Sequence, residues 1–232
     1  MKYFLINEHL PTEMRAALSV YGEPVPLPAW SALPFPVCAH PDMLAAKIGR
    51  SLLIHEEYRA GRAILDRIGI PYLLSRAPVG EKYPEDVRLN CLDTGKFFLS
   101  NEKYASADAL ALADGAGLRR IHVKQGYAKC SCVCANHAIA TMDRGIAKAA
   151  LREGIDVLLL EPSPIGIEVY DTGLIGGTSV LLNERTLGFF GRIEDLPGYS
   201  ALAEFFGARG VALVSLGRKP LFDYGGALDI EI

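Results

Sequence analysis

Three cysteines at alternate positions are the clearest candidates for chemistry in this sequence. Cys130, Cys132 and Cys134 lie in the run GYAKCSCVCAN. Every second side chain of an extended strand points to the same face, so the spacing predicts three thiols on one face. One of them could act as a nucleophile if its pKa were lowered, a base lay nearby and the thiol were partly exposed.

Two other interpretations of the cysteines stay open beside the nucleophile. A metal site would need further ligands such as His40, His137 or Cys91, because C-x-C differs from the usual C-x2–4-C spacing. In the third interpretation the three cysteines only fill space in the core, since cysteine is a small and commonly buried residue. We expect neither a bound metal nor a cofactor.

Polar residues elsewhere could complete a site with these thiols. His40 and Asp42, in the run HPDM, could form an oriented acid/base pair. Equally, His40 could be a loop residue without a catalytic role, fixed in place by the geometry of Pro41. Asp93 and Asp229 fall on predicted strands, where an unpaired carboxylate is costly. A cationic ligand would offset that cost, as would a salt bridge to Lys129 or Arg88. Asp93 is also a candidate turn residue, because Thr94-Gly95 follows it.

Composition narrows the class of protein. The chain has 232 residues, half of them apolar, with a formal net charge of −3. Its basic residues are scattered, which argues against a nucleic-acid surface, and no apolar run approaches the ~18 residues of a membrane span. The five cysteines are odd in number and crowded, and the N-terminus lacks a signal-peptide pattern. We therefore expect a cytoplasmic protein without nucleic-acid or membrane partners.

A recurring unit must position these side chains. The pattern strand, strand, helix, glycine, strand begins near residues 37, 87, 130 and 173, with helices predicted over 56–68, 106–113, 143–153 and 199–206. Residues 222–232 supply only a first strand. Residues 2–27 supply the missing strand, helix and strand, so five units are predicted to close into a ring within one domain, 1–232. An open doubly wound sheet would need one strand per helix rather than three.

A ring of five β-β-α-β units resembles the pentein fold, an α/β propeller of guanidine-modifying enzymes. These include arginine and agmatine deiminases, amidinotransferases and dimethylarginine hydrolases, and the chain looks most like an uncharacterised bacterial family of this fold. The resemblance implies a cysteine nucleophile, a histidine and carboxylates that bind a guanidinium at the ring's centre.

The family's motifs map onto this sequence with departures. The pattern GG-x-x-Cys near the C-terminus reads Gly225-Gly226-Ala227-Leu228-Asp229, so an aspartate replaces the thiol. The His-x-Asp pattern occurs as His40-Pro41-Asp42, in the first unit instead of the third. Residues 173–179 resemble the family's Gly-Gly strand, with Ser179 at its end but without the acidic residue.

Two functions follow from the resemblance. One is a cysteine-dependent hydrolase or transferase acting on a guanidino or related C–N compound. Its catalytic candidates are Cys130, Cys132, Cys134, His40 and Asp42, and its substrate-binding candidates are Asp93, Asp229 and Ser179. The other is a non-catalytic pentein that binds a small cationic ligand or a protein partner. The aligned thiols favour the first function and Asp229 favours the second, and either is compatible with a homo-oligomer.

Overall fold

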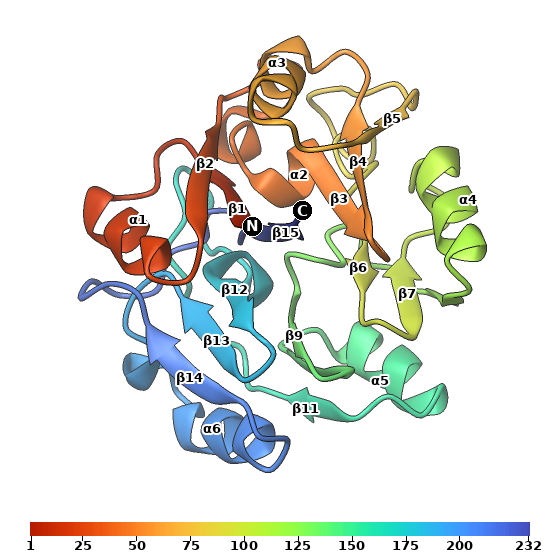
Figure 1. The fold of residues 1–232 in the computed structure, drawn as a ribbon. Coiled ribbons are helices and arrows are strands. Elements are labelled where there is room, and N and C mark those ends of the chain that lie inside the picture. Colours follow the sequence, from red (N-terminus) through yellow and green to blue (C-terminus); the bar gives the residue numbers. More distant parts are fainter.

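The computed structural model describes residues 1–232 as five small three-stranded sheets, or blades, arranged in a ring (Figure 1). Each blade has an inner, a middle and an outer strand, and one helix at the ring's periphery. The first blade contains β3 (Ala45–Ile48), β4 (Ser51–His55), α3 (Arg59–Ile68) and β5 (Leu73–Ser75). The second contains β6 (Leu92–Asp93), β7 (Phe97–Ser100), α4 (Ala107–Gly115) and β8 (Arg119–His122).

The remaining blades repeat this order. The third contains β9 (Cys132–Ala135), β10 (Ala138–Thr141), α5 (Arg144–Arg152) and β11 (Val157–Leu159). The fourth contains β12 (Ser179–Asn183), β13 (Thr186–Phe189), α6 (Tyr199–Gly207) and β14 (Ala212–Ser215). The fifth contains β15 (Leu228–Glu231), β1 (Lys2–Asn7), α1 (Thr12–Ser19) and β2 (Glu23–Leu27). In every blade the inner and middle strands are antiparallel, and the helix links two parallel strands.

The two chain termini close the ring, as the sequence predicts. Strand β15 pairs with β1 in the register Tyr3↔Ile230 and Leu5↔Leu228. Both termini lie near the centre of Figure 1. The last blade is therefore assembled from both ends of the chain.

Capping residues and glycines explain where the peripheral helices begin and end. The Ser106 hydroxyl and the Asp143 carboxylate accept backbone N–H bonds at the starts of α4 and α5. Gly69 and Gly154 follow α3 and α5 with φ of 74° and 82°, a conformation that glycine adopts without strain. None of the helices combines the length and hydrophobicity that a membrane crossing requires.

The hydrophobic core consists of five clusters, one between each pair of neighbouring blades. Leu53 and Phe98, for example, belong to the cluster between the first and second blades, and Val180 and Phe4 to that between the fourth and fifth. The other three clusters fill the remaining gaps in the same way. Apolar packing thus holds the blades together around the ring.

The inner strands begin later than the sequence pattern predicts. Residues 35–44 contain the short helices η1 (Phe35–Val37) and α2 (Pro41–Leu44), and residues 173–178 contain η2 (Ile175–Thr178). A further short helix, η3 (Ile193–Asp195), precedes α6. Proline and glycine in these segments favour turns over strands. Cys130 also lies in a turn ahead of β9, where the Ser131 amide donates to the carbonyl of Tyr127.

The prediction of three thiols on one face is therefore wrong. Cys132 and Cys134 share a face of β9 and pack between the second and third blades. Cys130 belongs instead to the cluster between the fifth and first blades. The strand periodicity starts only at Cys132, so it does not extend to Cys130.

Candidate functional site

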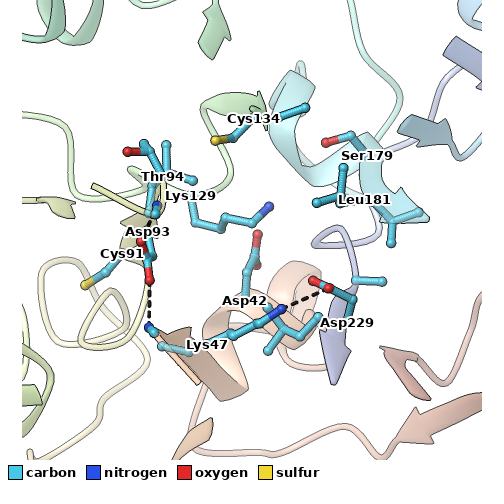
Figure 2. Close-up of a pocket in the computed structure, with 18 of the residues that line it drawn as sticks. Asp42, Lys47, Cys91, Asp93, Thr94, Lys129, Cys134, Ser179, Leu181 and Asp229 are labelled. Carbon is cyan, nitrogen blue, oxygen red and sulfur yellow. Dashed lines mark hydrogen bonds and ion pairs between the residues drawn. The ribbon is translucent and has the colours of Figure 1, made fainter. Parts of the chain in front are cut away.

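A cavity of about 460 Å³ occupies the centre of the ring. Inner strands of all five blades line it, together with the turns that flank them. Its walls carry four acidic side chains and two lysines, namely Asp42, Asp93, Glu184, Asp229, Lys47 and Lys129. Figure 2 shows Asp42, Lys47, Lys129 and Asp229 pointing toward the middle of this space. The cavity wall thus combines hydrophobic side chains with charged ones, and it carries more acidic than basic groups.

Strand alternation places several of these side chains. Lys47 lies between the buried Ala46 and Ile48 on β3, and Asp229 lies between the buried Leu228 and Ile230 on β15. The apolar neighbours pack between blades, so the polar residue faces the axis.

Asp229, which follows the Gly225-Gly226 pair by three residues, forms an ion pair. The Lys47 ammonium lies 2.8 Å from its Oδ2 and the Lys2 ammonium lies 3.8 Å from the same atom. The predicted salt-bridge partners, Lys129 and Arg88, do not contact it: Arg88 donates to the carbonyls of Pro78 and Tyr104. Oδ1 of Asp229 accepts no hydrogen bond from the protein and is free to bind a ligand.

Asp93 is the last residue of β6, where its side chain stabilises the turn that follows and forms part of the cavity wall. Its Oδ1 accepts the Gly95 amide at 2.6 Å, and its Oδ2 accepts the Gly49 amide at 2.7 Å. These two N–H donors fix the carboxylate in place. Ser179 also lines the cavity, and its hydroxyl donates to the carbonyl of Gly176 at 3.0 Å.

Asp42 is the most buried carboxyl of the cavity. It is 1% exposed, its Oδ2 accepts a hydrogen bond from the Cys130 thiol at 2.9 Å, and its Oδ1 has no partner. Burial raises the pKa of Asp42 to about 7, because water no longer solvates the charge, and the nearby Lys129 ammonium opposes this increase. Asp42 is therefore a carboxyl that exchanges its proton near neutral pH.

Asn90 links the segments that carry Asp42 and Cys130, although no pattern in the sequence had indicated a role for it. Its side-chain amide donates to the Cys130 sulfur at 2.9 Å and to the Asp42 carbonyl at 3.2 Å. Its Oδ1 accepts the backbone amides of Lys129 and Cys130. Asn90 precedes its blade's inner strand, as Asp42 and Cys130 precede theirs, and a comparison of these equivalent segments would have singled it out.

Lys129 is the other polar group that reaches the axis. Its ammonium makes no hydrogen bond and lies in no ion pair within 4.0 Å, although Asp42 is close enough for its pKa to be affected. Gly226 lies beside it, and a Cβ at that position would be in ordinary contact with Nζ at 3.5 Å. The cavity thus contains one paired lysine, Lys47, and one without a fixed partner, Lys129.

His40 and Asp42 diverge at the start of α2 instead of forming a pair. The buried His40 Nδ1 lies 3.7 Å from Oδ1 of Asp223, and its ring is outside the cavity wall. Oδ1 and Oδ2 of Asp223 accept the amides of Gly225 and Leu174. Burial lowers the pKa of His40, so its imidazole is neutral near pH 7.

The thiols have no imidazole partner. Cys91 and Cys134 line the cavity, and burial raises the pKa of each to about 12. Cys132 is fully buried with a pKa of about 12, and burial with Asp42 nearby raises that of Cys130 well above its ordinary value. None of the five histidines hydrogen-bonds to a sulfur. No group of three His, Cys, Asp or Glu side chains is arranged to hold a metal ion.

The sequence matches the family of unknown function DUF6873 over residues 5–228. The chain belongs to this family. No curated protein sequence matches it. This family membership agrees with the expected resemblance to an uncharacterised family.

Solved structures establish the fold of this DUF6873 chain. A Cys-to-Ser mutant of DDAH from Pseudomonas aeruginosa, complexed with citrulline, is 12% identical with a TM-score of 0.53, covering 99% of this chain and 98% of that one. A His-to-Gly dimethylarginine dimethylaminohydrolase in an adduct with S-methyl-L-thiocitrulline is also 12% identical, with a TM-score of 0.54 and 99% coverage of both chains. The chain therefore has the pentein fold.

Proposed function

We propose that this DUF6873 protein binds a small cationic compound of the guanidino class in its central cavity. The observation that carries the proposal is the set of four carboxyl side chains on the cavity wall. Asp229 is the one among them in an ion pair, with the ammonium groups of Lys47 at 2.8 Å and Lys2 at 3.8 Å. Oxygen atoms of Asp42 and Asp229 without a protein donor then offer acceptor sites to the ligand's N–H groups.

A guanidinium suits this geometry better than a simple ammonium ion. It is planar and directs N–H donors outward in several directions, so carboxylates on different walls can bind it at once. Asp42 and Asp229 lie on the first and fifth blades, and Asp93 lies on the second. The structurally similar dimethylarginine dimethylaminohydrolase was solved as an adduct with S-methyl-L-thiocitrulline, which supports a ligand of related chemistry here.

Binding without a cysteine nucleophile is the function we favour. Asp229 occupies the position of the GG-x-x-Cys thiol and is ion-paired with Lys47. The catalytic roles predicted for Cys130, Cys132, Cys134 and His40 have no thiol–imidazole contact to support them.

Cysteine-dependent turnover is a second candidate because Cys134 lines the cavity beside Lys129. In this candidate the Cys134 thiolate, stabilised by the bound cation, would attack the guanidino carbon and a C–N bond would break. The thiol's proton would leave with the ammonia or amine, and water would then hydrolyse the carbon–sulfur bond and restore the thiol.

Isothermal titration calorimetry with L-arginine, agmatine and methylguanidine tests the proposal. We expect saturable one-site binding of at least one compound and a weaker affinity for the variants Asp93→Asn and Asp229→Asn. Asp114→Asn is the matched control, because Asp114 is an ion-paired aspartate on the surface. Absence of binding, or equal affinity in all three variants, would contradict the proposal.

Product analysis separates the two candidates. Release of ammonia or an amine from the bound compound, lost in Cys134→Ser, would establish turnover. Binding without any such release would leave the protein as a binding pentein.

A further inference from the structure

One oxygen of Asp42 distinguishes this residue from the other carboxylates of the cavity. Oδ1 is buried and has no hydrogen-bond partner, whereas both oxygens of Asp93 accept backbone amides. The Cys130 thiol holds Oδ2 at 2.9 Å, so the carboxyl cannot rotate without losing that donor. A polar atom buried without a partner is costly, and a ligand in the cavity is the available source of one.

Charged and titratable groups approach Asp42 from several elements. Lys129 and Cys130 precede β9, and Asp223 precedes β15. On its own segment, the neutral His40 points away toward Asp223. The Lys129 ammonium favours an ionised Asp42, while burial and the Asp223 carboxylate favour a protonated one. As a result of these opposing effects, Asp42 populates both its ionised and its protonated state near neutral pH.

We infer that Asp42 determines the charge specificity of the cavity, selecting a cationic guanidino group when ionised and a neutral ureido group when protonated. This inference rests on the proposed function and adds to it the residue that sets ligand selectivity. An ionised carboxylate accepts N–H bonds from a guanidinium. A protonated carboxyl can donate its O–H to a ureido carbonyl, which a guanidinium lacks.

Lys129 strengthens the preference for the neutral group at low pH. Its ammonium has no fixed partner and can donate to a carbonyl oxygen placed beside Asp42, whereas it repels a guanidinium. Once Asp42 is ionised, it offsets that repulsion. The two side chains therefore act together on the same part of the ligand.

The size of the switch follows from the proton equilibrium of Asp42. Its pKa of about 7 means that the ionised fraction increases about tenfold between about pH 6 and about pH 8, and the protonated fraction falls about tenfold. Affinity for a guanidino ligand should increase up to about tenfold over this range. The preference for the guanidino over the ureido ligand should then change up to about 100-fold.

L-Arginine and L-citrulline form a matched pair for the test, because they differ only in the guanidinium and ureido groups. Their dissociation constants would be measured by calorimetry between about pH 6 and about pH 8, in two buffers with different ionisation enthalpies. We expect the arginine-to-citrulline preference to rise with pH, and arginine binding near pH 7 to release about half a proton.

Two variants make the result specific to Asp42. Asp42→Asn keeps a donor and an acceptor but cannot ionise, so its ligand preference should not change with pH. Asp229→Asn should bind arginine more weakly and still show the pH-dependent preference.

The possible failures are distinct. If neither ligand nor any other guanidino compound binds, the proposed function is wrong and the inference is wrong with it. If both ligands bind with a preference that is independent of pH, or if Asp42→Asn retains the pH dependence, only the inference is wrong.

Discussion

Replacing Asp42 with asparagine should change how the stability of the protein depends on pH. The side chain is 1% exposed and its Oδ1 has no partner. Burial raises its pKa from an ordinary value of 3.8 to about 7. The native protein therefore binds the Asp42 proton more tightly than the unfolded chain does.

The sign of the effect follows from proton linkage. As the pH rises through about 4, the unfolded chain loses the Asp42 proton while the native protein keeps it, so the free energy of unfolding decreases. This loss is complete once the pH exceeds the native pKa of about 7. A pKa difference of about 3, at 1.36 kcal/mol for each tenfold change, corresponds to about 4 kcal/mol.

Urea denaturation of the two proteins at several pH values measures this effect. Ionisable groups remote from Asp42 titrate alike in both proteins, so they cancel in the difference between the two free energies of unfolding. The Cys130 thiol, whose pKa burial raises well above its ordinary value, keeps its proton over this pH range. From about pH 4 to about pH 8 that difference should shift by about 4 kcal/mol in favour of Asp42→Asn. Asp114→Asn, the surface control, should show a much smaller shift.

A difference that stays constant with pH would refute the reasoning. It would mean that Asp42 is ionised in the native protein throughout this range, with Lys129 compensating the cost of burial. A shift in the opposite direction would mean that the native site stabilises the carboxylate more than water does.

Three further substitutions or deletions test the packing around the axis. Gly225→Ala should lower the free energy of unfolding by about 3 kcal/mol, because φ is +76° and the added Cβ would clash with the buried His40. Gly69→Ala, at a similar φ but with open space around it, should lower it by about 1 kcal/mol in the same urea denaturation experiment. Cys130→Ala should cost about 1–3 kcal/mol by removing the donor to Asp42, and Cys130→Ser, which keeps a donor, should cost less. Deleting residues 228–232 removes the strand that pairs with β1 and should abolish the cooperative thermal transition seen by circular dichroism; a retained transition would contradict ring closure.

The fold could be predicted because its signals are local and repeated. Apolar runs, a helical stretch and a glycine recur through the chain, and the incomplete units at the two ends complement each other. These features require no knowledge of side-chain contacts. The ring of five blades and the pairing of β1 with β15 follow directly from them.

Part of the site was harder to predict because it is built from the turns ahead of the inner strands. Strand periodicity does not apply there, so Cys130 faces away from Cys134 and His40 away from Asp42. Contacts between blades also determine which polar side chains bind one another. Lys47 binds Asp229 across the first and fifth blades, and Asn90 binds Cys130 across the second and third, at sequence separations of 182 and 40 residues.

The most direct test of the central claim is a crystal structure of the protein grown with saturating L-arginine. We expect electron density for the ligand between the five inner strands. Its guanidinium nitrogens should lie about 3 Å from carboxylate oxygens of Asp42 and Asp229. A cavity that contains only solvent under these conditions, or a ligand whose guanidinium points away from both carboxylates, would contradict it.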